Sequence, residues 1–249
     1  MQLAHATWIE VERYLTSSTG IIIPIGSTEQ HGPIGLLGTD YLCPEAIARG
    51  AGDELECLVG PTITIGMSQH HLAFPGSVSV RPSTLVAVIA DTVQSLAVHG
   101  FDRFFFLNGH GGNEAPLETA FGEVYTSVSL SPGRRHLYCK FANWSYGPRA
   151  MALIDELFGE AEGSHATPSE VALTYFLQPR LARSAELDPP IAPKGDMFDA
   201  WDYRERFPDG RIGANSALAT AEHGRELYRA AVADVVEAYR EFAEKAPST

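Results

Sequence analysis

The sequence has little positive charge, and what it has is scattered. Its 249 residues contain 18 Lys and Arg against 31 Asp and Glu, so the formal net charge is −13. The nearest approach to a basic cluster is the pair Arg134-Arg135, and an adjacent pair of this kind is usual for solvated surface. Because nucleic-acid binding depends on clustered Lys and Arg, we expect no nucleic-acid partner.

Long apolar runs and paired cysteines are also missing. No apolar run approaches the roughly 18 residues needed to cross a bilayer, so we expect no membrane partner. The N-terminus lacks the basic segment followed by an apolar core that marks a secretory signal. The three cysteines, Cys43, Cys57 and Cys139, show no CxxC spacing. An odd number of isolated cysteines fits a reducing compartment, and we expect a soluble cytoplasmic protein.

The sequence does contain alternating strand-like and helical patterns. With 45% hydrophobic residues, a chain of this length can bury a sizeable core, and no linker or repeat interrupts it. We expect strands at residues 20–25, 58–65, 103–107 and 135–141, and helices at residues 7–15, about 41–50, 82–98, 114–124, 171–177 and 217–243. The order predicts one α/β domain over residues 1–249, a layered sandwich with a mostly parallel central sheet flanked by helices.

The first group of reactive side chains follows the apolar strand at residues 20–25. Glu29, His31 and Asp40 come directly after it, where the carboxyl end of a strand in an open α/β sheet presents reactive groups. Two carboxylates and an imidazole suit Zn²⁺, Mn²⁺ or Fe²⁺ better than Ca²⁺ or Mg²⁺. From this spacing alone, a structural interpretation in which the carboxylates cap turns stays open.

The second group lies after the strand at residues 103–107, where residues 108–113 read NGHGGN. His110 is flanked by glycines and has little to pack against, and glycines permit close backbone approach to a metal or substrate. Glycine-rich turns between strands and helices also bind phosphates, which is a competing interpretation. The dinucleotide-binding order GxGxxG is not met.

The third group is His165 with Glu170, at a predicted loop-to-helix junction. Glu170 could face the same cavity as His110, or it could only stabilise the first turn of the helix that follows. Two further histidines, His70 and His71, lie in a turn-rich loop, where one of the pair is expected to have a packing role.

Taken together, the chain resembles the creatininase (creatinine amidohydrolase) family over most of its length. The motifs that carry the resemblance are, in order, PIGSTEQHGP, GTD, HHLAFPGS, NGHGGN, the segment from His165 to Glu170, and GANSALATAEHGRELY. The resemblance implies an α/β sandwich on a mostly parallel sheet and hydrolysis of a cyclic or linear amide. It also implies two divalent metal ions, zinc with manganese or iron as alternatives, and a homo-oligomer, namely a hexamer.

The resemblance assigns roles to individual positions. The positions that match the family's metal ligands are Glu29, His31, Asp40 and His110, with Asp40 in the place of the bridging residue. Gly112 stands where creatininase proper has a glutamate ligand. The branch that contains NGHGGN takes its last carboxylate from the segment that ends here at Glu170, which makes Glu170 the fifth expected ligand. His165 matches the histidine assigned to proton transfer and is the expected catalytic residue.

The expected reaction is metal-dependent hydrolysis of a non-peptide C–N bond in a small amide, lactam or formamide, by a metal-activated water. Residues 34–36 and 167–169 depart from the family's usual residues beside the substrate cavity, so creatinine itself is not the expected substrate. The expected substrate contacts are His71, Ser77, Trp144 and Tyr146. For Trp144, Tyr146 and Trp201, packing in an oligomer is an equal alternative to a wall over the substrate.

Other functions stay open at this stage. Relatives that trim the peptide precursor of a redox cofactor make a peptidase-like activity one alternative. A phosphate- or nucleotide-binding module that uses the Gly-rich turn without hydrolysis is another. A catalytically inactive relative that acts as a binding subunit is a third. The irregular stretch at residues 187–211 is long enough to be functional or to form an interface.

Overall fold

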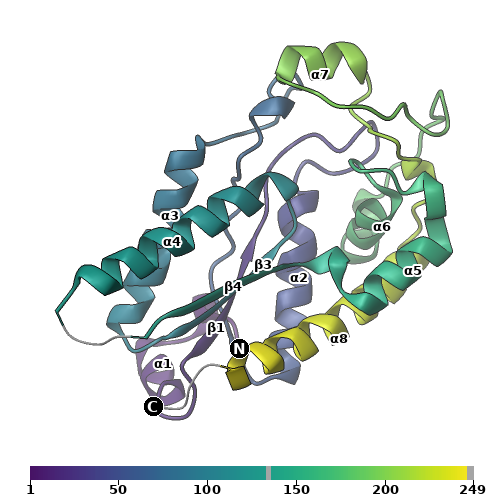
Figure 1. The fold of residues 1–249 in the computed structure, drawn as a ribbon. Helices are drawn as coiled ribbons and strands as arrows, with labels where there is room; N and C mark the ends of the chain where they lie inside the picture. Colours follow the sequence, from purple (N-terminus) through teal and green to yellow (C-terminus); the bar gives the residue numbers. More distant parts are fainter. Residues whose placement is uncertain (133–135, 246–249) are drawn as a thin grey trace.

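Four parallel strands form the centre of the protein (Figure 1). The structure is a computed structural model that describes residues 1–132 and 136–245. The strands are β1 (Gly20–Ile25), β2 (Leu58–Val59), β3 (Arg103–Asn108) and β4 (Tyr138–Asn143). Their order across the sheet is β2-β1-β3-β4, and each neighbouring pair is parallel. This confirms the predicted α/β class and the parallel sheet.

Helices cover both faces of this sheet. They are α1 (Trp8–Tyr14), α2 (Thr39–Glu54), α3 (Pro82–Val98), α4 (Glu114–Leu130), α5 (Pro148–Phe158), α6 (Pro168–Leu177), α7 (Ala200–Arg206) and α8 (Ala221–Lys245). Successive strand side chains point to opposite faces. Ile22 and Phe105 therefore pack with α2, α6 and α8, whereas Ile21 and Phe104 pack with α3 and α4. Both faces are buried, which is why β1 and β3 are apolar almost throughout.

Several boundaries differ from those expected from the sequence. The strand predicted at 58–65 is only Leu58–Val59, because Gly60 and Pro61 follow and proline cannot donate a ladder hydrogen bond. The strand predicted at 135–141 is observed from Tyr138, and Arg135 lies outside the described residues. Helix α4 extends past residue 124 to Leu130, and helices α5 and α7 were not expected.

Helix α2 is longer than the helix predicted at about residues 41–50, since it begins at Thr39 and continues to Glu54. Asp40 therefore lies in the first turn of a helix and not in the preceding loop. The glycines near residue 50 do not end the helix. A Cβ at Gly52 would lie 2.5 Å from Val59 Cγ2, so this glycine allows the helix to approach the sheet closely.

The segment between α6 and α8 crosses the end of the sheet where the strands terminate, and it carries α7. Arg211, which is fully buried, holds this segment in place. Its guanidinium donates hydrogen bonds to the carbonyls of Pro189, Pro190 and Ala214. It also pairs with Asp209 at 2.7 Å. Across the described residues, no helix has the length and apolar character needed to cross a membrane.

Candidate metal centre

The predicted ligands meet at the carboxyl edge of the sheet. Glu29 and His31 follow β1, and His110 follows β3. Asp40 projects from the first turn of α2, and Glu170 from the first turn of α6. Because parallel strands end at the same edge, segments far apart in sequence converge there.

Asp40 lies between two groups of donor atoms. Its Oδ1 is 2.9 Å from His31 Nε2, and its Oδ2 is 3.1 Å from His110 Nδ1. Glu29 Oε1 is 3.4 Å from His110 Nδ1 on one side. Glu170 Oε2 is 3.8 Å from His31 Nε2 on the other side. The donor atoms of Glu29, Asp40 and His110 lie within 4.8 Å of one another, as do those of His31, Asp40 and Glu170.

Backbone carbonyls orient both imidazoles. His31 Nδ1 is 3.1 Å from the carbonyl of Glu29, and His110 Nε2 is 3.0 Å from the carbonyl of Met67. Each of these nitrogens carries the N–H, since a carbonyl only accepts. In the neutral tautomers, His31 Nε2 and His110 Nδ1 therefore direct lone pairs at the carboxylates, which is the arrangement usual for histidine ligands of metals.

Without a metal, these groups form charged pairs. Burial by itself would raise the pKa of Glu29, but the positive charges of His110 and His71 lower it to about 2. Burial opposes the charge on His31, yet Asp40 and Glu170 raise its pKa to about 10. The pKa of His110 rises to about 9 against the same burial effect, because of Glu29 and Asp40. Imidazolium protons thus occupy the space between carboxylates that a cation would take.

Two buried oxygens in this cluster make no hydrogen bond of normal geometry to the described residues: Glu29 Oε1 and Asp40 Oδ2. Imidazole nitrogens approach both of them, but without hydrogen-bond alignment. A buried carboxylate oxygen that lacks a well-aligned hydrogen bond is costly. A mixed set of carboxylate and imidazole donors fits a divalent transition-metal ion at each of the two groups.

Glu170 combines the two roles considered for it from the sequence. Its Oε1 accepts a hydrogen bond of 2.6 Å from the backbone N–H of Thr167, and Thr167 Oγ1 accepts one from the backbone of Glu170. This capping box begins α6. It leaves Oε2 directed at His31. Burial raises the pKa of Glu170 to about 7, although His31 opposes the rise.

His165 lies against this cluster. Its Nε2 is 2.8 Å from the carbonyl of Gln30, and its Nδ1 is 3.9 Å from Glu29 Oε1. Its ring centroid is 4.7 Å from that of His31 and 4.5 Å from that of His71. Burial first, and then the positive charges of His71 and His31, hold the pKa of His165 well below its usual value. The imidazole is therefore neutral, with its Nδ1 lone pair facing the centre.

A group of hydrogen-bonded side chains around Gln30 lies behind the cluster, and the sequence did not predict it. Gln30 Nε2 lies between 2.9 and 3.1 Å from His71 Nδ1, His165 Nε2, Tyr203 Oη and the carbonyl of Gly210. Gln30 stands between two predicted ligands in the motif, which is a signal that could have been used. Tyr203 comes from the irregular segment at 187–211, and no local pattern marks it.

Ser68 and Ser77 support the loop that carries Glu29. Ser68 Oγ donates to Glu29 Oε2, and Ser77 Oγ accepts from the backbone N–H of Gln30 at 3.1 Å. His71 is buried with its Nε2 3.0 Å from Glu29 Oε1. Neither His71 nor Ser77 lies among the described residues that line the neighbouring cavity. Their contact with substrate stays a prediction.

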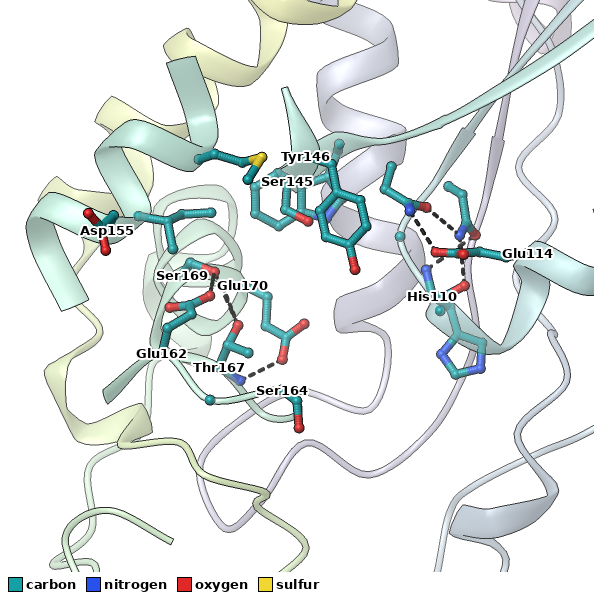
Figure 2. Close-up of a pocket in the computed structure, with 18 of the residues that line it drawn as sticks. His110, Glu114, Ser145, Tyr146, Asp155, Glu162, Ser164, Thr167, Ser169 and Glu170 are labelled. Carbon is teal, nitrogen blue, oxygen red and sulfur yellow. Dashed lines mark hydrogen bonds between the residues drawn. The ribbon is translucent and has the colours of Figure 1, made fainter. Parts of the chain in front are cut away.

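A cavity of about 490 Å³ adjoins the centre, with His110 and Glu170 in its wall (Figure 2). Trp144 and Tyr146 line it, and their contact with a substrate stays a prediction. Trp144 is 4% exposed and packs into the core, whereas Tyr146 is 66% exposed. Trp201 is 75% exposed on α7 and is not part of this wall among the described residues.

Known proteins resemble this chain along nearly its full length. The family model described as creatininase, creatinine amidohydrolase, matches residues 4–239. A mycofactocin precursor peptide peptidase from Mycobacterium tuberculosis is 37% identical, covering 89% of this chain and 84% of the relative. A 3-dehydro-scyllo-inosose hydrolase from Thermotoga maritima is 31% identical (97% and 83%). A creatinine amidohydrolase from Pseudomonas putida is 25% identical, covering 96% of each.

Solved structures show the same fold. A creatininase in a manganese form has a TM-score of 0.85 at 24% identity, covering 99% of both chains. A mutant creatininase of Zn–Zn type has a TM-score of 0.81 at 24% identity, covering 99% of this chain and 98% of that one. With the family model matched over most of its length, the chain belongs to the creatininase (creatinine amidohydrolase) family of hydrolytic enzymes.

Proposed function

We propose that this enzyme is a metal-dependent hydrolase that cleaves a C–N bond in a small cyclic amide, lactam or formamide. The observation that carries the proposal is the position of Asp40, whose two carboxylate oxygens belong to two separate groups of donor atoms. One group would hold a cation through Glu29, Asp40 and His110. The other would hold a second cation through His31, Asp40 and Glu170.

The donor chemistry supports zinc, with manganese or iron as alternatives. When bound, two such cations lower the pKa of a water from about 15.7 toward about 7 and polarise a substrate carbonyl. The protein contributes the orientation of its donors, because the backbone carbonyls of Glu29 and Met67 fix the imidazoles of His31 and His110. Glu29, His31, Asp40 and His110 are buried, so bulk water has little access to their donor atoms.

His165 is the proposed proton carrier. Its Nε2–H is held by the carbonyl of Gln30, so its Nδ1 is the free position and faces Glu29. A neutral imidazole can take a proton there from the attacking water and give it to the departing nitrogen. No side chain needs to form a covalent intermediate in this scheme.

The cavity supports a small substrate. Its volume of about 490 Å³ lies in the range typical of small-molecule sites, roughly 300–1,000 Å³. A phosphate-binding function receives no support from this geometry, since the carboxylates of Glu29, Asp40 and Glu170 face the same space and repel anions unless a metal intervenes.

A second candidate is cleavage of a peptide bond. The relative named as a mycofactocin precursor peptide peptidase is 37% identical to this chain, which supports a peptide as the alternative substrate. The proposed water chemistry is the same for both. Hydrolysis rates for matched lactams, formamides and short peptides would separate the two candidates.

The experiment that tests the proposal is metal quantification in the purified enzyme, combined with that substrate panel before and after chelation. We expect up to two divalent ions per chain, loss of hydrolysis on chelation, and recovery with Zn²⁺ or Mn²⁺. Hydrolysis that persists in fully chelated enzyme would overturn the proposal.

We also propose that the enzyme forms a homo-oligomer, with a hexamer as the expected state. Phe198 and Trp201 are 82% and 75% exposed near and on α7, and large aromatic side chains are enriched at protein interfaces. Light scattering on the purified protein would give the assembled mass. A monomer at micromolar concentration would contradict this assignment.

A further inference from the structure

The cavity beside the candidate metal centre has an acidic lining. Glu114, Asp155 and Glu162 contribute to its wall, and Glu170 borders the centre. No Lys or Arg occurs among the described residues that line it. In Figure 2, Glu114 lies beside His110 on one side of Tyr146, and Asp155 and Glu162 lie on the other side. A bound molecule would therefore have carboxylates on more than one side.

Bound cations would not cancel this charge. Two divalent ions bring four positive charges, and the ligand carboxylates of Glu29, Asp40 and Glu170 already offset three of them. At most one positive charge then remains against the three further carboxylates of the wall. The chain as a whole carries a formal net charge of −13, so the surroundings do not reverse the sign. The local field favours positively charged molecules and disfavours anions.

Hydrogen bonds hold two of these carboxylates in place. Glu114 Oε1 accepts from Asn143 Nδ2 at 2.7 Å, and Glu162 Oε1 accepts from Ser169 Oγ. Glu162 Oε2 is buried and has no hydrogen-bond partner among the described residues. An unpaired buried carboxylate oxygen is costly, and burial accordingly raises the pKa of Glu162. A cationic hydrogen-bond donor in the cavity would supply the missing partner after a small rotation of the side chain.

The rest of the wall fits an apolar body with a cationic end. Tyr146, Met151 and Ile154 line the cavity with aromatic and aliphatic surface. Tyr146 is 66% exposed, and its ring projects into the space between the acidic side chains. The face of an aromatic ring attracts a positive charge, so Tyr146 and the carboxylates favour the same kind of ligand.

We infer that the substrate of this enzyme is a cationic amide, with an ammonium, amidinium or guanidinium group bound by Glu162 in the cavity beside the metal centre. The inference rests on the proposed function only in placing the scissile C–N bond at the metals. It excludes substrates whose recognition group is a carboxylate or a phosphate.

The test compares two ligands of nearly identical shape, benzamidinium and benzamide, by calorimetric titration of the zinc-loaded enzyme. We expect benzamidinium to bind about tenfold more tightly than benzamide, because one charge-assisted hydrogen bond is gained. Glu162→Gln keeps an acceptor for Ser169 and removes the charge. In that variant we expect benzamidinium to lose about tenfold in affinity and benzamide less than about twofold.

Two controls make the result decisive. Glu160→Gln removes a neighbouring exposed carboxylate that does not line this cavity, and it should leave both affinities unchanged. If Glu162→Gln weakens both ligands equally, the variant has disturbed the cavity. In that case the variant Glu114→Gln, on the other side of Tyr146, is measured in the same way. A loss of benzamidinium affinity with benzamide affinity unchanged supports the cationic subsite, and an equal loss for both ligands overturns it.

Failure of this inference is distinguishable from failure of the proposed function. Benzamide binding as tightly as benzamidinium to the wild-type enzyme would overturn the cationic subsite, even if hydrolysis needs metal. Selective benzamidinium binding together with chelator-resistant hydrolysis would leave the subsite standing and overturn the metal mechanism.

Discussion

Replacing Asp40 by asparagine removes the one carboxylate that belongs to both groups of donor atoms. Oδ1 of Asp40 lies 2.9 Å from His31 Nε2 and Oδ2 lies 3.1 Å from His110 Nδ1, so each oxygen faces a different proposed ion. Glu170 belongs to only one of these two groups. The two substitutions Asp40→Asn and Glu170→Gln should therefore differ in how many ions they remove.

The expected loss of metal affinity follows from the number of ions that each residue would hold. Loss of a residue that merely orients a ligand weakens metal affinity about 10- to 100-fold, so loss of a carboxylate ligand should cost at least about 100-fold, or about 2.7 kcal/mol, for each ion it holds. Asp40→Asn should cost this for both ions, about 5 kcal/mol in sum, and leave almost no metal after dialysis. Glu170→Gln should lose one ion and keep the other.

The assay is elemental analysis of dialysed protein, with affinities from competition against a chelator. Asp234→Asn is the matched control, since Asp234 is a buried aspartate that accepts hydrogen bonds from the backbone of Arg149 and Ala150, away from the centre. It should lower stability and leave the metal count unchanged. One ion retained by Asp40→Asn, or both lost by Glu170→Gln, would refute the shared-carboxylate geometry.

Three further predictions concern protons and hydrogen bonds around the centre. In the metal-free protein the pKa values of His31 and His110 are raised to about 10 and about 9, above about 6.5 for an unfolded histidine, so the folded state binds protons more tightly. This stabilisation is complete below about pH 6.5 and is lost as pH rises toward 9 to 10. The melting temperature of chelated enzyme should therefore fall across that window. A melting temperature that does not change with pH would contradict the charged pairs of His31 and His110 with the carboxylates. His165→Asn should lower kcat by about 10²- to 10⁴-fold with the metal content unchanged, whereas a drop in bound metal would identify His165 as a ligand. Tyr203→Phe removes the hydroxyl that donates to the Gly210 carbonyl at 2.7 Å and should cost about 1–2 kcal/mol in denaturant unfolding; an unchanged midpoint would show that Gln30 alone satisfies that carbonyl.

Prediction from the sequence succeeded for elements whose structure depends mainly on their own residues. Strand β1 and helix α3 have the predicted bounds, because a continuous apolar run and a proline-started helix depend little on distant contacts. The cap of α6 at Thr167 was also predictable, since the capping box is formed by residues three apart. The boundaries failed where tertiary packing overrides local preference, as at Gly52 in α2, whose lack of a side chain allows contact with Val59.

The choice between structural and metal-binding interpretations of single residues could not be made from local sequence. Glu170 is the clearest case, since one of its oxygens caps a helix while the other faces His31. The same is true of Asp40, which lies in a helix turn and yet has both oxygens directed at imidazoles. Spacing along the chain says nothing about which oxygen is left over once local hydrogen bonds are made.

The sequence by itself determined most of the elements, though not α5, α7 or the length of β2, and it determined the kinds of donor available, because hydrophobic periodicity, caps and motif residues are local properties of the chain. Tertiary structure alone decided that Asp40 is shared between two groups, that Tyr203 reaches the centre from residues 187–211, and that the neighbouring cavity is acidic. The physical reason is that the site is made of segments that are far apart in the sequence and meet only in the folded protein. The parallel sheet brings the ends of β1 and β3 to one edge, where α6 and the irregular segment close over them, and charge and distance are defined only after that packing.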